Sequence, residues 1–279
     1  MIPRGYFKEI PTADTIFGAI ANMVVEIFGN EGLEDLIRTF RESDAALSSA
    51  FPYDDRTFYF PKPLGIELWS LHLSSKEDYE YFKALKKAKY LSLKDFKKAI
   101  NNEKFEIPEE LPIKEFDVPR VALDRVTKAS TIFYEKRIAF HNGGLYFLYK
   151  GPKEAFEEYI KPAVRLLGDT GIGGNSTQGL GIFEPEFTEI SINAPESEYA
   201  VTLSNAVVDR ENLVLWDLFI KGGWTKTKRK PKITFIREGS IVRFQDPGEL
   251  IEMDLGIGYS IYVHAKTFPV PILIPKEVD

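Results

Sequence analysis

The stretch GDTGIGGNSTQGLGIFEP, residues 168–185, holds six glycines in eighteen positions. Glycine loses more backbone freedom on folding than any other residue, so such a run indicates a backbone that must go where a Cβ cannot. An amphipathic helical pattern over residues 152–168 leads into this loop, and a strand pattern over residues 179–192 leads out of it. With two strand-like runs before the helix, the order strand, strand, helix, glycine-rich loop, strand predicts an α+β fold.

The loop carries neither of the common phosphate-binding motifs. Gly174 stands where a P-loop needs lysine, and Ser176 stands where G-x-G-x-x-G needs its last glycine. Because a helix leads into the loop, the loop lies at the negative end of that helix, where a phosphate is disfavoured. Consecutive amides of a glycine-rich turn can still form a concave nest of donors for an anion. The alternative is a tight connection in which glycine only relieves crowding.

The composition is that of an ordinary globular protein without cysteine. The chain has 279 residues, of which 44% are hydrophobic and 28% charged, and its formal net charge is −6. The lack of cysteine excludes disulfides, thiolate metal sites and a cysteine nucleophile, and we expect no metal and no other cofactor. No apolar run approaches the ~20 residues that cross a membrane, and the N-terminus lacks the apolar core of a signal peptide. We expect a cytoplasmic protein with no membrane partner.

Two lysine-rich stretches are candidates for a local basic surface on this acidic chain. They are residues 83–100 and Lys226–Lys232. Each is either a surface for a polyanion such as nucleic acid or a solvated lysine face. Arg4 is similarly ambiguous between an RNA contact and a terminal salt bridge.

Apolar periodicity predicts four elements near the N-terminus. They are helices over residues 12–29 and 32–44, and strands over residues 46–53 and 56–64. Thr12 or Asp14 is expected to cap the first helix and Gly29 to end it. Further along, HNGG at residues 141–144 predicts a hairpin with a type I′ turn, and Pro162 predicts a helix kink.

The later part of the chain carries mostly strand-like patterns. These lie at residues 199–208, 231–245 and 258–268, while residues 213–224 fit helix or strand. The acidic, proline-rich residues 105–120 are interpreted as an extended excursion rather than as core. We expect two small sheets, each with helices on one face.

Five segments together resemble a known family. They are ADTIFGAIANMV (13–24), SSAFPY…PKPL (48–64), KAKYLSL (87–93), VPRVALDRVTKAS (118–130) and VRLLGDTGIGGNSTQGLGIFE (164–184). In this order they resemble subunit four of the type III-A CRISPR effector, the Csm complex, which is a RAMP protein. REGSIV, Arg237–Val242, is similar to a second signature of that family. Family members usually begin with a full strand, whereas only MIPRGYFKEIP precedes the first helix here.

The resemblance implies two ferredoxin-like (RRM-like) RAMP folds packed together. The first would span residues 1–190, with the glycine-rich loop before its last strand and a thumb-like insertion at about 76–118. The second would span residues 191–279. The implied role is to bind the repeat-derived 5′ handle of crRNA without catalysis. The implied partners are crRNA, the large polymerase-like signalling subunit and a backbone RAMP subunit (subunit three).

The RNA contacts expected from this resemblance and from physical chemistry are cations, hydroxyls and bare amides. The expected residues are Arg120, Arg125, Thr127, Lys128, Ser130, Gly168, Thr170, Gly171, Gly173, Gly174, Asn175, Ser176, Thr177, Gln178, Lys86, Lys87 and Lys89. The three lysines belong to the implied thumb, which would wedge between bases where the handle ends. The alternative for Arg125 is a salt bridge to Asp124 or Asp117.

The rival class is a metal-independent RAMP endoribonuclease that processes CRISPR RNA, which would need a histidine-centred acid–base pair. His72 and His264 lie in strand-like runs, where a buried, hydrogen-bonded ring is expected, and His141 is expected to be exposed. Since no partner clusters with them in the sequence, we predict no enzyme. A scaffold whose glycine-rich loop never meets RNA is the third alternative.

Overall fold

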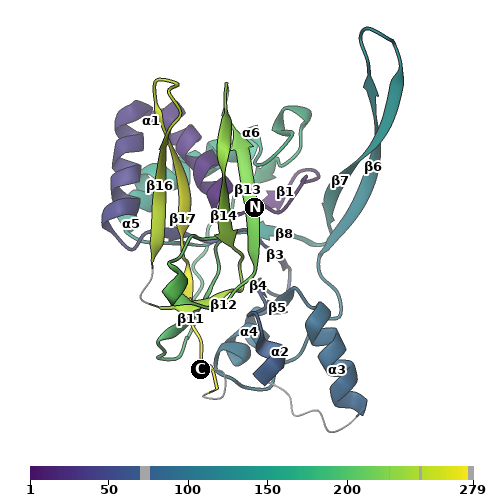
Figure 1. Cartoon of the computed structure of the whole chain (residues 1–279), viewed down its shortest axis with the longest axis vertical. Coiled ribbons are helices and arrows are strands. Elements are labelled where there is room, and N and C mark those ends of the chain that lie inside the picture. Colours follow the sequence, from purple (N-terminus) through teal and green to yellow (C-terminus); the bar gives the residue numbers. More distant parts are fainter. Residues whose placement is uncertain (70–75, 226, 245–246, 276–279) are drawn as a thin grey trace.

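The computed structural model describes residues 1–69, 76–225, 227–244 and 247–275. It has a mixed α and β body from which one long hairpin, β6–β7, stands away (Figure 1). The helices are α1 (Ala13–Glu42), α2 (Ile66–Trp69), α3 (Lys76–Lys87), α4 (Leu93–Ile100), α5 (Lys153–Ala155) and α6 (Lys161–Thr170). A π turn (Phe156–Ile160) joins α5 to α6, and 3₁₀ turns lie at Ser176–Gln178 and Arg210–Asn212.

The strands pair mostly as two-stranded ribbons, with one four-stranded sheet in the order β12-β15-β11-β18. The paired ribbons are β1-β10, β2-β9, β3-β8, β4-β5, β6-β7, β13-β14 and β16-β17. The bounds in the first half are β1 (Ile2–Pro3), β2 (Ala46–Leu47), β3 (Phe51–Asp54), β4 (Tyr59–Pro61), β5 (Tyr90–Ser92), β6 (Ile113–Leu123), β7 (Ser130–Phe140), β8 (Gly143–Tyr146) and β9 (Tyr149–Lys150). In the second half they are β10 (Phe183–Glu184), β11 (Tyr199–Thr202), β12 (Leu213–Leu215), β13 (Leu218–Trp224), β14 (Arg229–Ile236), β15 (Ile241–Arg243), β16 (Gly248–Asp254), β17 (Ser260–Lys266) and β18 (Pro269–Pro271).

The two helices expected near the N-terminus form one broken helix, α1. Gly29 adopts φ 71° and ψ −164°, which interrupts the helix without ending it. The predicted capping by Thr12 or Asp14 is wrong, because Thr12 makes no side-chain capping bond. The Ala13 amide donates instead to Ser49 Oγ (3.0 Å) and the Asp14 amide to Asn205 Oδ1 (3.4 Å). The start of α1 is therefore satisfied by residues distant in sequence.

By length and mean hydropathy (1.2), α1 is a helix that could cross a membrane, which the sequence reading missed. Its inward side chains Ile16, Phe17 and Ile20 are at most 1% exposed inside the protein core. Such packing is typical of a core helix in a globular domain. The helix also carries acidic and basic residues along its second half.

Two hydrophobic clusters form most of the core, and the second joins both halves of the chain. The first packs α1 against α6 and the start of the chain. The second combines Phe60 and Phe96 with Val201, Ile241 and Ile272. The core therefore does not divide at residue 190. The boundary predicted there, and the ferredoxin-like character of each half, stay predictions.

The hairpin predicted at residues 141–144 is wrong. Asn142 has a positive φ of 49°, but β7 pairs with β6 and β8 pairs with β3. A Cβ on Gly143 would lie 1.9 Å from Tyr53 O, so glycine is needed there for close strand approach. HNGG is a corner between two ribbons. The projecting element is thus residues 113–140, whereas β5 and α4 from the predicted insertion pack in the body.

The predicted break at Pro162 takes the form of the π turn that precedes it. Proline has no N–H to donate, and a wider turn accommodates the missing bond. After the glycine-rich loop, only Phe183–Glu184 of the strand predicted over residues 179–192 is paired, with β1. The ambiguous residues 213–224 form strands β12 and β13.

Candidate nucleic-acid interface

The glycine-rich loop runs from the end of α6 to β10 and is fixed at both shoulders. Ile172 and Leu180 are each 3% exposed, and the Ile172 amide donates to Gly181 O (3.0 Å). A Cβ on Gly181 would lie 2.1 Å from Ile172 O, and one on Gly171 would lie 2.7 Å from Leu180 O. At Gly171 and Gly181, the two ends of the loop, glycine is therefore needed because a side chain would clash with the backbone.

The outer part of the loop is different, because its amides are free. Among the described residues, the backbone N–H groups from Gly173 to Thr177 make no hydrogen bond. A Cβ on Gly173 would meet nothing within 4 Å, and one on Gly174 would meet only the Lys8 side chain. Asn175, in the left-handed conformation with φ 64°, turns the chain into the 3₁₀ turn. Successive bare amides of this kind can accept an anion.

The middle and outer part of the β6–β7 ladder, around the pairs Val118↔Glu135 and Arg120↔Phe133, lies against this loop. Arg120 of β6 donates to Gln178 of the loop, and Asn175 of the loop donates to Glu135 of β7. Arg120 Nε also lies 3.3 Å from Glu135 Oε2. The structure thus brings together three predicted site residues from segments 55 residues apart or more.

Glu135 organises the cations at this junction. Arg120 and Arg137 each lie 3.3 Å from Glu135 Oε2. Desolvation alone would raise the pKa of Glu135, but the hydrogen bonds from Arg137 and Arg120 outweigh it and the pKa is lowered. The carboxylate therefore stays charged and holds both guanidinium groups beside the loop, at the cost of neutralising part of their charge.

Sequence reasoning missed four residues of this junction: Tyr6, Lys8, Glu135 and Arg137. Lys8 reaches Gly174, as its Nζ would lie 3.3 Å from a Cβ built there. Tyr6 O accepts from the Gly181 amide (2.9 Å), and the Arg137 guanidinium lies 6.0 Å from the Tyr6 ring centroid. The one sequence signal near Tyr6 and Lys8 was the cationic start of the chain, for which the sequence suggested Arg4 as a possible RNA contact. Arg4 forms an exposed ion pair with Glu184 (3.1 Å).

Four predicted residues lie at the far end of the hairpin, away from the loop. They are Arg125, Thr127, Lys128 and Ser130. Asp124 accepts the amides of Val126 (2.8 Å) and Thr127 (3.1 Å), and these bonds lower the pKa of Asp124. Asp124 therefore closes the turn, and Arg125 forms no ion pair with it or with Asp117 among the described residues.

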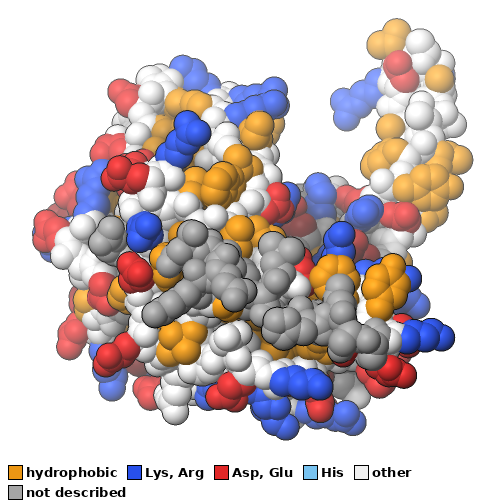
Figure 2. Space-filling model, turned by 60° about the horizontal axis from the view of Figure 1, so that its bottom comes forward, with side chains coloured by type: hydrophobic (Ala, Val, Ile, Leu, Met, Phe, Trp, Pro, Cys, Tyr) orange, Lys and Arg blue, Asp and Glu red, His pale blue; other side chains and the backbone are white. Residues whose placement is uncertain are grey.

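The hairpin also carries exposed apolar side chains, which gather along it in Figure 2. Val121, Leu123, Ile132 and Tyr134 are between 58% and 71% exposed. By the pairing register, these side chains lie on the face opposite to Arg120 and Glu135. The face turned to the glycine-rich loop thus carries Arg120 and Glu135 together with Phe133, which is 48% exposed, and the opposite face is apolar toward the tip.

The remaining predicted residues lie elsewhere. Gly168 is buried in α6, where a Cβ would lie 2.6 Å from Phe183 O, and Thr170 Oγ1 donates to backbone oxygens of its own helix. Lys86, Lys87 and Lys89 are exposed at the end of α3, below the hairpin in Figure 1. The second basic stretch enters β14, with Lys226 outside the described residues.

The histidines described offer little for acid–base chemistry. His264 is fully buried, accepts the Leu47 amide at Nε2 (3.2 Å), and has its pKa lowered to about 3 by burial and by nearby Lys266. His141 is exposed, as predicted. His72 lies outside the described residues. No group of three or more His, Asp or Glu residues suited to a metal ion occurs in the part described.

Comparisons with known proteins give the family. The RAMP superfamily model matches residues 9–184. The chain is 50% identical to the CRISPR system Cms protein Csm4 of Thermococcus onnurineus, over 100% of this chain and 97% of that protein. It is 23% identical to the Csm4 of Methanocaldococcus jannaschii, over 96% and 91% of the two chains.

Solved structures give the same result. A chain of a Csm1–Csm4 cassette in complex with cA4 matches with a TM-score of 0.83 and 44% identity, over 99% of this chain and 96% of that one. A chain of a Csm3–Csm4 subcomplex matches with a TM-score of 0.71 at 21% identity, which shows the fold alone. The mixed α and β fold is thus that of a RAMP protein. Within that superfamily the chain belongs to the Csm4 family, subunit four of the type III-A CRISPR effector complex.

Proposed function

We propose that this Csm subunit holds the 5′ handle of crRNA between the glycine-rich loop and the β6–β7 hairpin. The observation that carries the proposal is the row of free amides from Gly173 to Thr177 beside Lys8 and Arg120. Main-chain donors and guanidinium groups suit phosphate oxygens, which give affinity without requiring a particular base. The tip cations of the hairpin would then contact a strand that leaves the loop.

The proposal includes docking. One relative was solved as a Csm1–Csm4 cassette and another as a Csm3–Csm4 subcomplex. We propose the corresponding partners here: the large signalling subunit and a backbone RAMP subunit, with the assembly in the cytoplasm. The apolar face of the β6–β7 hairpin supports a role in assembly, because monomeric proteins seldom leave such a face uncovered.

We also propose that the subunit performs no chemistry. A buried His264 with a pKa near 3 cannot exchange a proton with substrate at neutral pH, which argues against the nuclease alternative. Incubation of labelled repeat RNA with the purified chain tests this point. Specific scission that is lost in His141→Ala would overturn it.

The RNA site is tested by Gly174→Glu. This variant places a carboxylate among the free amides, and we expect affinity for handle RNA to fall at least tenfold. Gly18→Glu is the matched control, because it adds the same charge on α1, where a Cβ meets nothing within 4 Å. Wild-type affinity should fall steeply with salt, as phosphate contacts require. Equal affinity of the two variants, or a flat salt response, would contradict the proposal and favour a scaffold without RNA contact.

A further inference from the structure

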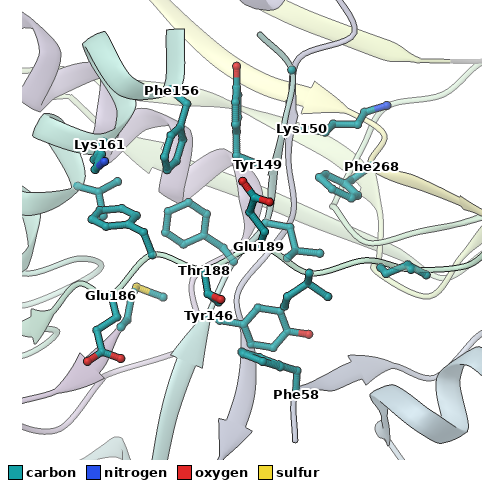
Figure 3. A pocket seen from close by; sticks show the side chains of 18 of the residues that line it. Phe58, Tyr146, Tyr149, Lys150, Phe156, Lys161, Glu186, Thr188, Glu189 and Phe268 are labelled. Carbon is teal, nitrogen blue, oxygen red and sulfur yellow. The ribbon is translucent and has the colours of Figure 1, made fainter. Parts of the chain in front are cut away.

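Residues 185–197, here called the strap, connect β10 to β11 in an extended course. No residue of the strap lies in a helix, strand, turn or bend, and none has a positive φ. The strap crosses the ends of β8 and β9, where Thr188 and Glu189 lie between Phe156 on one side and Phe268 on the other (Figure 3). It is therefore a straight segment laid across the body.

Over residues 190–193 the side chains of the strap alternate as in a strand. Ile190 and Ile192 are half-buried and pack against the second core cluster, whereas Ser191 and Asn193 are exposed. Alternation with a period of two is the pattern of a strand with one face on a core. The sequence also predicted a strand as far as residue 192. The side-chain pattern of a strand is therefore present over residues that have no strand partner.

The backbone of the strap is unpaired. Among the described residues, no N–H or C=O group from residue 185 to 196 takes part in a hydrogen bond. The first hydrogen bond comes at the last residue of the strap, Ser197, whose hydroxyl donates to Ile272 O (2.7 Å). A row of unpaired main-chain groups is a ready template for a strand from another chain. Proteins commonly use it for β-augmentation, in which neighbouring pockets select side chains.

Such a pocket lies beside the strap. It has a volume of about 800 Å³ and is lined mainly by apolar and aromatic side chains, among them Tyr53, Phe58, Tyr146, Phe156 and Phe268. Figure 3 shows the rings of Phe58, Tyr146, Phe156 and Phe268 around the strap residues Thr188 and Glu189. Aromatic-lined pockets of this size accept a large apolar side chain.

The charge of the strap selects the kind of partner. The chain has five glutamates between residues 184 and 198 and no lysine or arginine from residue 166 to 209. Glu184 and Glu198 are paired with Arg4 and Arg243, but Glu189 and Glu196 form no ion pair in the described part. Lys161, at the edge of the pocket, is paired with Glu157 (2.6 Å), while Lys150 and Lys153, which also line the pocket, form no ion pair in the described part. The glutamates of the strap itself, Glu186, Glu189 and Glu196, are exposed and attract a basic protein segment.

We propose that the strap is an open strand that receives an extended, basic segment of a protein partner, whose backbone pairs with residues 186–194 and whose apolar side chains enter the aromatic pocket. The inference rests on the proposed function, because the partner is taken to be one of the two subunits that dock on this chain. It goes further by naming the surface and the chemistry of the contact. The strap is thereby separated from the RNA site.

Amide hydrogen exchange on the full-length chain tests the proposal. The free chain is compared with the chain bound to the purified large subunit, to the purified backbone subunit, and to handle RNA. We expect amides of residues 186–194 to exchange fast in the free chain and to slow at least a hundredfold with one protein partner, but not with RNA. Fast exchange in every complex, or slowing by RNA alone, would overturn the proposal.

A charge-reversal pair adds a second readout. Glu186→Lys/Glu189→Lys is expected to weaken binding of that partner at least tenfold while leaving handle RNA affinity no lower. Glu31→Lys/Glu34→Lys on α1 makes the same charge change at exposed sites and serves as control. If both pairs bind the partner equally while RNA still binds, the strap inference fails and the proposed function stands. If wild type binds neither RNA nor subunit, both fail.

Discussion

At the scale of single residues, Lys128 at the tip of the β6–β7 hairpin is a charged residue in a backbone conformation that favours glycine. Lys128 has a positive φ of 56°, which costs a residue with a side chain about 1 kcal/mol. Its amide donates to Asp124 O (2.9 Å), so the turn needs this conformation. Lysine therefore occupies a position whose backbone conformation would suit glycine better, which is consistent with a role for its charge.

Replacing Lys128 by glycine should leave stability unchanged or slightly higher, because the strain is relieved. Affinity for handle RNA should fall, and the slope of log K against log salt should decrease by about one, since one phosphate contact is lost. Lys128→Arg keeps the charge and should bind like wild type. Titration of labelled RNA at several salt concentrations measures both. Equal slopes in the glycine and arginine variants would show that the tip makes no phosphate contact.

Buried His264 predicts a pH dependence of folding. Its pKa is lowered to about 3 by burial, while the unfolded ring titrates near 6.5. Between these values the unfolded state binds more protons, so stability falls as the pH drops below about 6.5. From pH 7 to pH 5 this group should remove roughly 2 kcal/mol.

The variant His264→Gln keeps an acceptor for the Leu47 amide but cannot be protonated. It should lose correspondingly less stability than wild type over the same pH range, measured by urea denaturation. Other groups that titrate, such as buried Glu238 with its raised pKa, contribute equally to both proteins. Identical losses in the two proteins would mean that the pKa of His264 is the same in the folded and unfolded states.

At the scale of elements, the β6–β7 hairpin is held mainly by its own ladder of cross-strand pairs, from Ile113↔Phe140 to Leu123↔Ser130. Its contacts with the body lie at its base, where Ile138 pairs with Phe7 and joins the first core cluster, and further out, where Arg120 and Glu135 meet the loop. An element of this kind contributes little to global stability. It is available for binding instead.

Residues 121–132 can accordingly be replaced by an Asn-Gly turn between the paired residues Arg120 and Phe133. We expect the free energy of unfolding to change by less than about 1 kcal/mol, because the removed part contacts little else. Handle RNA affinity should fall, since the tip cations are gone. Urea denaturation and RNA titration of the same preparation measure the two effects. A large loss of stability would show that the outer hairpin is part of the folded core.

Helix α1 and the β6–β7 hairpin differ in how much of each could be predicted from the local sequence. The periodicity of Ile16, Phe17 and Ile20 predicted the first part of α1, because packing on one core face leaves a trace in the sequence, but it did not predict that the helix continues past Gly29. The partner of β7 was missed because the proline-rich residues 105–120 were interpreted as an extended excursion, although Pro119 lies in β6. In an isolated ribbon both strands are edges, so a proline is tolerated. Without a partner for β7 on its N-terminal side, the Asn-Gly pair within residues 141–144 led to the wrong prediction of a hairpin there.

The site was only partly accessible to sequence for a similar reason. The glycine-rich composition of the loop indicated its role, and the neighbouring cations of residues 120–128 indicated that of Arg120. Lys8 and Glu135 became neighbours of the loop only through the pairing of β1 with β10 and the position of the β6–β7 hairpin beside the loop. Nothing in their local sequence distinguishes them from other surface charges.

At the scale of the whole molecule, the second core cluster ties the two halves together. Phe60 and Phe96 pack with Val201, Ile241 and Ile272. Glu238, from the segment similar to a second family signature, accepts a hydrogen bond from Ser49. Burial of this kind contributes roughly 25 cal/mol per Å² of apolar surface, and it is lost if either half is absent.

A fragment of residues 1–190 should therefore fail to fold alone. We expect no cooperative thermal transition by circular dichroism, whereas the intact chain should unfold in one main transition. Co-expression with residues 191–279 should restore the transition, because the missing core residues are then supplied in trans. A cooperative transition in the isolated fragment would instead support the domain boundary predicted at residue 190.

The capping of α1 by Ser49 and Asn205 has a bearing on how the protein is made. The first helix leaves the ribosome when about 160 residues still separate it from Asn205, and Lys221, which pairs with Asp14, follows later still. Until those residues emerge, the start of α1 lacks two of its polar partners, although α6 and the other buried residues of the first core cluster have already been made. The core around α1 can thus begin to form during synthesis, whereas the start of the helix is fixed only after Asn205 and Lys221 have emerged.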